Sequence, residues 1–152
     1  MDKEFYSNLH ELHGDSIWSD ISIPLHEAWG LKAEQFAGKV VLEAGCGGMG
    51  AQALQLRGYE PASLLCIDLS SENIIMARRS FHALYPDDDR TEFRQLNLCE
   101  DNLPGETFDI IHHRGVFQHL SDKDAALDNF HQALKPGGIL LIGAYGHGGL
   151  LS

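Results

Sequence analysis

The stretch VVLEAGCGGMG, residues 40–50, decides the fold. Its apolar start predicts a buried strand, and the glycines at positions 45, 47, 48 and 50 predict a tight turn into a helix. The stretch contains G-x-G-x-x-G, a pattern that often holds a dinucleotide pyrophosphate at a helix N-terminus. Glu43, however, places a carboxylate two residues before the first glycine, where it would repel a phosphate. The glycines alone therefore do not identify the ligand.

Short apolar runs alternate with amphipathic stretches along the chain, which is the pattern of an α/β fold. Strands are predicted over residues 39–45, 63–69, 92–98, 107–113 and 139–145. Helical crossovers between them predict a doubly wound, mostly parallel sheet of about five strands. A ligand is expected at the carboxyl ends of the central strands.

Three helices are predicted between these strands. The first covers residues 50–58, and the second is capped by Ser70 and stopped by Pro86, with Ile74, Ala77, Phe81 and Leu84 on its apolar face. The third begins at a capping box of Ser121 and Asp124 and is broken by KPGG at 135–138.

Residues 1–38 differ in composition from residues 39–152, which form the predicted ligand-binding domain. This first segment is rich in aromatic residues and histidine, and 24–36 reads as a helix with Pro24 near its start and Gly38 as its stop. We expect a helical cap or lid over the ligand site. Simple packing of Trp18 and Trp29 on the sheet is an equal alternative.

Composition excludes several classes of function. The chain of 152 residues has 22 acidic against 11 basic side chains and a net charge of -11, which disfavours non-specific binding to nucleic acid or to an anionic membrane. Three scattered cysteines form no zinc spacing, and the adjacent His112 and His113 should face opposite sides of a strand, so no metal site is expected. We find no signal peptide or membrane-spanning run and expect a cytoplasmic protein.

The charge of Glu43 separates two ligands that a glycine loop could hold. In a dinucleotide site Asp68, at the end of the second strand, would bind the ribose hydroxyls, but Glu43 would oppose the phosphates. S-adenosylmethionine carries a cationic sulfonium and a cationic amino group and no phosphate. Glu43 would favour that ligand, either directly or through water.

Residues 39–143 resemble the class I S-adenosylmethionine-dependent methyltransferases. The resemblance rests on four motifs in order: VVLEAGCGGMG, then LLCIDLS at 64–70, LNLCEDNLPGETFDIIHHRGVFQHL at 96–120 and LKPGGILLIG at 134–143. It implies transfer of a methyl group from S-adenosylmethionine to a small-molecule acceptor, with S-adenosylhomocysteine as product. It also implies cofactor contacts by Glu43, Gly45, Cys46, Gly47, Asp68, Leu69, Asn97, Leu98 and His113.

One position departs from the family pattern. Asn97 stands where an aspartate usually contacts adenine, and we expect it to meet the adenine amine through its side-chain carbonyl. A simple strand end at this position is an equal alternative.

The catalytic residues cannot be assigned from the motifs. Methyl transfer is an in-line displacement in which alignment and exclusion of water can carry much of the catalysis. His113 and His119 are candidate bases, although His119 is more often a structural histidine at such a position. A non-catalytic S-adenosylmethionine-binding module and an NAD-dependent oxidoreductase are the alternative functions.

The sheet of this family usually has two more strands after the fifth. Here the chain ends in ILLIGAYGHGGLLS, which would leave ILLIGAY as a long apolar edge. We therefore expect either a homodimer formed through this edge or a sequence that is a truncated piece of a longer protein.

Overall fold

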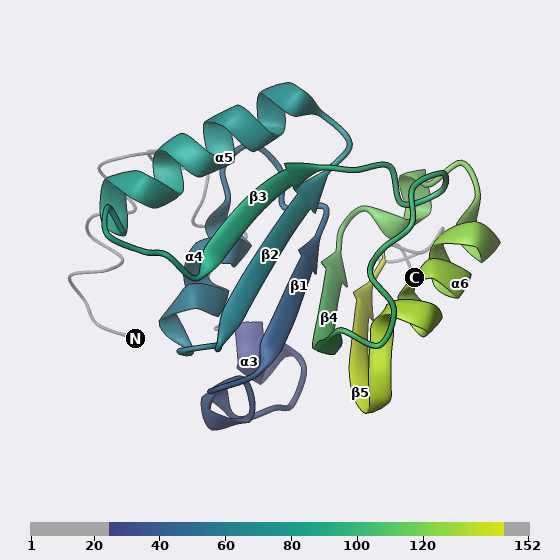
Figure 1. Ribbon diagram of the computed structural model, residues 1–152, viewed down its shortest axis with the longest axis horizontal. Coiled ribbons are helices and arrows are strands. Elements are labelled where there is room, and N and C mark those ends of the chain that lie inside the picture. The colour runs from purple at the N-terminus through teal and green to yellow at the C-terminus, as the bar shows by residue number, and fades with distance from the viewer. Residues whose placement is uncertain (1–24, 145–152) are drawn as a thin grey trace, which may run out of the picture.

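The computed structural model describes residues 25–144, in which five strands form one parallel sheet (Figure 1). The strands are β1 (Val40–Ala44), β2 (Ser63–Asp68), β3 (Thr91–Gln95), β4 (Phe108–Arg114) and β5 (Leu134–Gly143). Their order is β3-β2-β1-β4-β5, and every neighbouring pair runs parallel. The predicted doubly wound α/β fold is confirmed, and the order reverses between β1 and β4, where such sheets bind ligands.

Helices cover both faces of the sheet. The helical segments are α3 (Leu25–Ala28), the 3-10 turn η2 (Ala33–Gln35), α4 (Ala51–Gly58), α5 (Ser71–Leu84), the 3-10 turn η3 (Phe117–His119) and α6 (Lys123–Ala133). Figure 1 shows α4 and α5 on one side of the sheet and α6 on the other. The central strands β1 and β4 are therefore buried along most of their length, whereas the edge strands β3 and β5 stay partly exposed.

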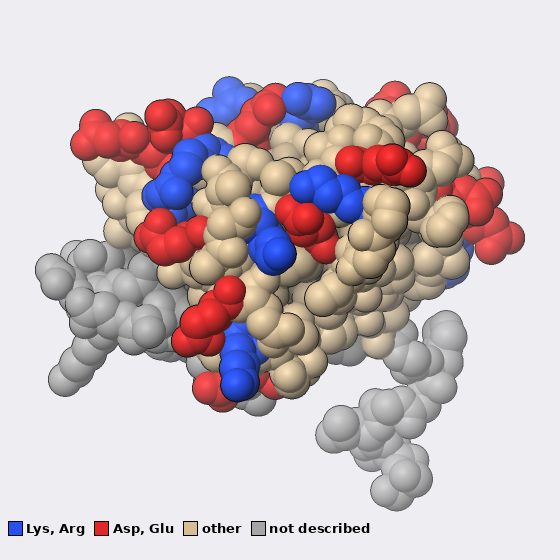
Figure 2. Space-filling model, turned by 60° about the horizontal axis from the view of Figure 1, so that its bottom comes forward, with Lys and Arg blue, Asp and Glu red and all other residues tan. Residues whose placement is uncertain are grey.

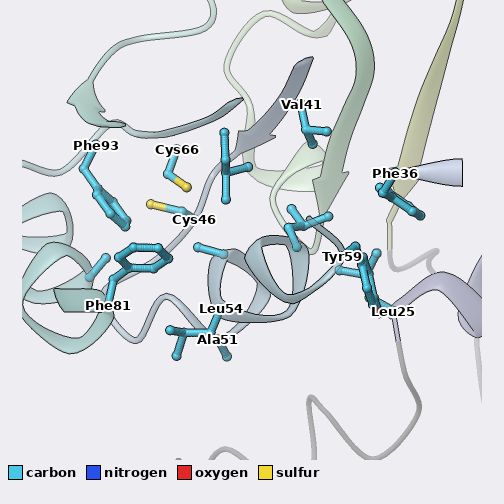
Figure 3. Packing of buried hydrophobic residues seen from close by; sticks show 14 of the residues in the cluster. Leu25, Phe36, Val41, Cys46, Ala51, Leu54, Tyr59, Cys66, Phe81 and Phe93 are labelled. Carbon is cyan, nitrogen blue, oxygen red and sulfur yellow. The ribbon is translucent and has the colours of Figure 1, made fainter. Parts of the chain in front are cut away.

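Two apolar clusters form the core, one on each face. The cluster under α4 and α5 includes Phe81 and Phe93, whose ring centroids lie 5.3 Å apart, and it extends to Leu25 and Phe36 beside Tyr59 (Figure 3). The cluster under α6 is built around Phe108, Ile111 and Phe130. The segment 25–38 thus belongs to the core that α4 covers.

The caps of the two longer helices differ in how well they were predicted. Ser70 caps α5 as expected, since its Oγ accepts a hydrogen bond from Asn73 N at 3.2 Å. The cap of α6 is Asp122 and not Ser121, because Asp122 Oδ1 accepts from Ala125 N at 2.9 Å. The predicted box was wrong by one residue, since an aspartate next to a serine offers the same capping chemistry.

Two predicted boundaries were also wrong. The segment 24–36 is not one helix, because α3 ends at Ala28 and the chain turns at Gly30, whose φ is +65°. KPGG does not lie ahead of the fifth strand but inside β5, where the pairing with β4 jumps from Phe108–Leu134 to Ile110–Ile139. The irregularity absorbs the Pro136-Gly137-Gly138 turn while the ladder continues on both sides of it.

Part of the expected N-terminal cap, including Trp18, lies outside the described residues. Trp29 packs against the core cluster beneath α4, and its ring meets the His112 ring edge-on at a centroid distance of 5.8 Å. Packing on the sheet therefore accounts for Trp29, and a lid role for residues 1–38 stays a prediction.

The surface carries mixed charge, and one edge of the sheet is open among the described strands. Figure 2 shows Lys and Arg interspersed with Asp and Glu on the face that it presents, with no large basic area. The outer edge of β5 pairs with no strand of residues 25–144, and Ile139 is exposed there. Pairing of this edge with a second copy stays a prediction. Within the same residues, no helix is long and apolar enough to cross a bilayer.

The cap of α6 gives a matched pair of substitutions. Asp122→Ala should lower the free energy of unfolding by about 1 kcal/mol, because Ala125 N–H loses its acceptor. Ser121→Ala should change it by less than about 0.5 kcal/mol, as expected for an exposed site without a cap. Urea denaturation of both variants measures the difference, and an equal loss in both would contradict the assignment of Asp122.

Candidate functional site

The glycine loop after β1 is fastened to the end of β2. Gly45 N and Cys46 N both donate to Ile67 O, at 2.8 and 2.9 Å. Gly47 N donates to Asp68 Oδ2 at 2.9 Å. Three consecutive loop amides thus have their acceptors on β2, which fixes the loop against the strand that neighbours β1.

Two glycines of the loop are needed for geometric reasons. Gly45 has a φ of +87°, and a Cβ built on it would lie 2.6 Å from Val116 Cγ2. Gly50 adopts the left-handed conformation at the N-cap of α4. A side chain at position 45 would have to displace the segment after β4, so the loop can lie close to that segment only as glycine.

Two cavities meet at this loop. The larger has a volume of about 340 Å³ and is lined by residues 45–52, Arg114 and Gly115. The smaller, of about 150 Å³, is lined by Gly45, Ile67, Asp68, Leu69, Leu96, Asn97, Leu98, Val116, His119 and Leu120. Because Gly45 lines both, the two cavities adjoin at the loop, at the carboxyl ends of β1, β2 and β4, as the fold predicts.

Asp68 has most of its acceptor capacity occupied by the protein. Its Oδ1 accepts from Ser70 N and from Asn73 Nδ2, each at 3.0 Å, and its Oδ2 accepts from Gly47 N. A carboxylate offers about four lone pairs. By that count one acceptor position on Oδ2 remains for a ligand among the described contacts.

Glu43 is fully buried and paired with a histidine. Its Oε2 lies 2.5 Å from His112 Nδ1, and the two residues are register partners across β1 and β4. Both have 0% exposure. Within residues 25–144, Glu43 Oε1 and His112 Nε2 have no hydrogen-bond partner. Glu43 therefore does not line either cavity but lies directly beneath the glycine loop.

The carboxylates give the loop a negative environment. Burial, together with the negative charges of Glu43 and Asp68, raises the pKa of the Cys46 thiol to about 12. Cys46 consequently stays protonated at neutral pH and is not a nucleophile. The same field favours a cationic ligand over a phosphate.

The two candidate histidines occupy different surroundings. His113 has 0% exposure, its Nδ1–H donates to Ala44 O at 2.7 Å, and it packs against Phe117 and Phe130. Burial lowers the pKa of His113, so its ring is neutral at pH 7. His113 lines neither cavity, whereas His119 lines the smaller one beside Asn97 and Leu98.

The remaining predicted residues gather around the smaller cavity. Leu69 is 65% exposed at its rim, and Leu98 is buried in its wall. Asn97 Oδ1 accepts a hydrogen bond from Cys99 N at 3.0 Å. The carbonyl that we expected to meet adenine is therefore already bonded to the backbone.

Some lining residues were missed by the sequence analysis. Gly115, Val116 and Leu120 follow β4 and reach the glycine loop only because β4 pairs with β1. The sequence did hold a signal for these residues, because the family-like motif over 96–120 continues past the end of β4 at Arg114. In the described part of the chain, no three His, Cys, Asp or Glu side chains are arranged to hold a metal ion.

Comparison with known families agrees with this geometry. Residues 42–140, more than half of the chain, match the family described as a methyltransferase domain. The chain belongs to this methyltransferase domain family. The match begins in β1 and ends in β5, so it covers the glycine loop and both cavities.

Curated relatives of the family carry several names. The chain is 33% identical over 108 residues to phosphoethanolamine N-methyltransferase 3 of Arabidopsis thaliana, which covers 71% of this chain and 21% of that protein. It is 32% identical over 119 residues to a ubiquinone biosynthesis O-methyltransferase of Pseudomonas syringae pv. tomato, covering 76% of this chain and 48% of that protein. The chain thus spans between about a fifth and a half of these relatives.

A solved methyltransferase-like structure supports the fold. A putative S-adenosyl-L-methionine-dependent methyltransferase of Methanococcus maripaludis superposes with a TM-score of 0.74 at 22% identity, covering 94% of this chain and 64% of that one. At this identity the likeness concerns the architecture alone.

The buried pair predicts a non-additive effect on stability. His112→Leu should lower the free energy of unfolding by about 3 kcal/mol or more, because it leaves the Glu43 carboxylate buried without its partner. The double variant Glu43→Leu/His112→Leu should be more stable than His112→Leu alone, since both polar groups are then removed. Chemical denaturation of both single variants and the double variant measures the coupling. Losses that simply add would contradict a direct Glu43–His112 interaction.

Proposed function

We propose that the chain is an S-adenosylmethionine-dependent methyltransferase domain that transfers a methyl group to a small-molecule acceptor. The observation that carries the proposal is the pair of adjoining cavities at Gly45, which lie in the field of Glu43 and Asp68. This combination of an open glycine loop and negative charge suits a ligand that joins an adenosine to a cationic amino acid.

The residues of the site fit the parts of that cofactor. The smaller cavity, with apolar walls and Asn97 at its side, would hold the adenine, and the free acceptor position of Asp68 would bind a ribose hydroxyl. The larger cavity would hold the methionine portion. Arg114 lines that cavity and would pair with the ligand carboxylate, whereas Glu43 beneath the loop would favour its positive charges.

The chemistry requires little of the protein beyond placement. When bound, S-adenosylmethionine supplies an activated methyl group on its sulfonium. The side chains around the loop would orient the ligand and exclude water. Cys46 is held protonated and His113 is neutral and buried away from both cavities, so neither is placed to act as a base in the described structure.

The acceptor is proposed only as a class. One relative is named for methylation of nitrogen in phosphoethanolamine, and another for methylation of oxygen in ubiquinone biosynthesis. A small metabolite is consistent with both names. A polyanionic acceptor such as nucleic acid is disfavoured by the net charge of -11.

The negative charge of the site distinguishes the proposed function from that of a nicotinamide oxidoreductase. A pyrophosphate at the loop amides would meet Asp68 on Gly47 N and Glu43 beneath Cys46. Both carboxylates would oppose it, whereas they favour a sulfonium and an ammonium. We therefore expect binding of S-adenosylmethionine without comparable binding of NAD.

Isothermal titration calorimetry tests this function with a matched pair of variants. The wild-type chain should bind S-adenosylmethionine and not NAD. Asp68→Ala should weaken the binding of S-adenosylmethionine by about 10- to 100-fold, because a ribose hydroxyl loses its charged acceptor and the loop loses the hydrogen bond from Gly47 N. Asp87→Ala removes the same charge from an exposed site after α5 and should change affinity less than about twofold.

Three outcomes would contradict the proposal. Tighter binding of NAD than of S-adenosylmethionine would reject the ligand, and equal losses in the two variants would reject the role of Asp68. Binding without formation of S-adenosylhomocysteine, across a panel of nitrogen and oxygen acceptors, would favour a non-catalytic binding module.

A further inference from the structure

We propose that His112 is a positioning residue that keeps Glu43 ionised, and that the charge held in this way makes the site favour S-adenosylmethionine over its neutral-sulfur product, S-adenosylhomocysteine. The inference rests on the proposed function, because it concerns how that cofactor and that product are told apart. His112 lines neither cavity, so it acts on the ligand only through Glu43.

The unpartnered atoms of the buried pair indicate how many protons it holds. One proton lies between Glu43 Oε2 and His112 Nδ1, which are 2.5 Å apart. Among residues 25–144, Glu43 Oε1 and His112 Nε2 have no hydrogen-bond partner, and both side chains have 0% exposure. A second proton would have to sit on one of these two atoms, as a buried donor with nothing to receive it.

A single proton gives the pair a net negative charge. The pair is then a neutral imidazole that donates Nδ1–H to a carboxylate, and only acceptor atoms are left unmet. Buried N–H groups without a partner are rarer in proteins than under-satisfied acceptors. The negative charge is costly in a buried site, and a cationic ligand close to it lowers that cost.

The packing around His112 holds its ring in place. Trp29 meets the ring edge-on, at a centroid distance of 5.8 Å and an interplanar angle of 82°, and itself packs against the core cluster beneath α4. His112 and Glu43 are also register partners across β4 and β1. The ring is thus held against the carboxylate and shielded from water.

The charge of Glu43 reaches the wall of the larger cavity. Burial is the largest cause of the raised pKa of Cys46, and the charge of Glu43 is the next. Cys46 lines the cavity in which the methionine portion of the cofactor is proposed to lie. S-adenosylmethionine carries a positive charge on its sulfur and S-adenosylhomocysteine does not. A unit charge acting across a partly buried site changes affinity on the order of tenfold.

The ratio of two dissociation constants tests the inference. Isothermal titration calorimetry gives the constants for S-adenosylmethionine and S-adenosylhomocysteine, and their ratio cancels a general loosening of the site, which a purely structural role of His112 would cause. His112→Phe keeps a ring but removes the Nδ1–H donor, whereas His112→Asn keeps a side-chain N–H for Glu43. Asp87→Asn removes one charge from an exposed site and is the matched control for Glu43→Gln.

The variants should fall into two groups. Glu43→Gln should reduce the preference for S-adenosylmethionine about tenfold, because the charge is removed while an oxygen still accepts from His112. His112→Phe should reduce it by a similar factor, because a buried carboxylate without its donor takes up a proton. His112→Asn and Asp87→Asn should stay within about twofold of the wild-type ratio.

The ring signals of His112 give a second measurement that needs no variant. In ¹⁵N spectra of the wild-type chain at pH 7, the ring should be neutral with its proton on Nδ1. A doubly protonated ring, or a neutral ring with its proton on Nε2, would overturn the inference.

Several binding results would also overturn it. An unchanged ratio in Glu43→Gln would show that the charge does not discriminate, and an unchanged ratio in His112→Phe would show that His112 does not maintain the charge. Equal falls in His112→Phe and His112→Asn would show that the N–H donor is not what matters. If His112→Phe fails to fold, Glu43→Gln and the ring signals decide. Failure of the wild-type chain to bind either ligand would reject the proposed function as well, whereas normal binding with unchanged ratios rejects this inference alone.

Discussion

The hydrogen bonds between the glycine loop and the end of β2 are the constraint on which the site depends. Ile67 O and the Asp68 carboxylate accept from three consecutive amides of the loop, and the same carboxylate accepts from Ser70 N at the start of α5. The loop after β1 and the connection from β2 to α5 are thereby held together at the carboxyl ends of these strands. The loop can then approach Val116 closely, because position 45 has no side chain. This arrangement is the reason why Gly45 lines both cavities.

The buried pair beneath the loop adds the electrostatic character. Glu43 and His112 lie opposite each other on β1 and β4, at the place where the strand order reverses. A fully buried carboxylate is costly unless it is hydrogen-bonded, and His112 supplies that bond. The Glu43 carboxylate, which would oppose a phosphate at the glycine loop, is thus held by His112 on the neighbouring strand β4. Its negative charge acts on the site from beneath the loop.

Local signals predicted most of the fold, and contacts distant in sequence account for what they missed. The apolar runs located all five strands, and the Ser70 cap was correct because capping depends on a few adjacent residues. The partner of Glu43 is 69 positions away along the chain, and it depends on the register between β1 and β4, which no local pattern reveals. The orientation of Asn97 depends on which atom Cys99 N meets, so the residue type alone suggested the carbonyl. The residues after β4 join the site for the same non-local reason.

The central claim is that the loop after β1 holds the cofactor between the ends of β2 and β4. The most direct measurement is a titration of the ¹⁵N-labelled chain with S-adenosylhomocysteine, followed through the backbone amide resonances. The account predicts that the largest shifts belong to Gly45, Gly47, Leu98 and Gly115, which line the two cavities. Shifts centred instead on residues 89–92, which line a cavity near the amino ends of the strands, would contradict it, as would the absence of any saturable shift.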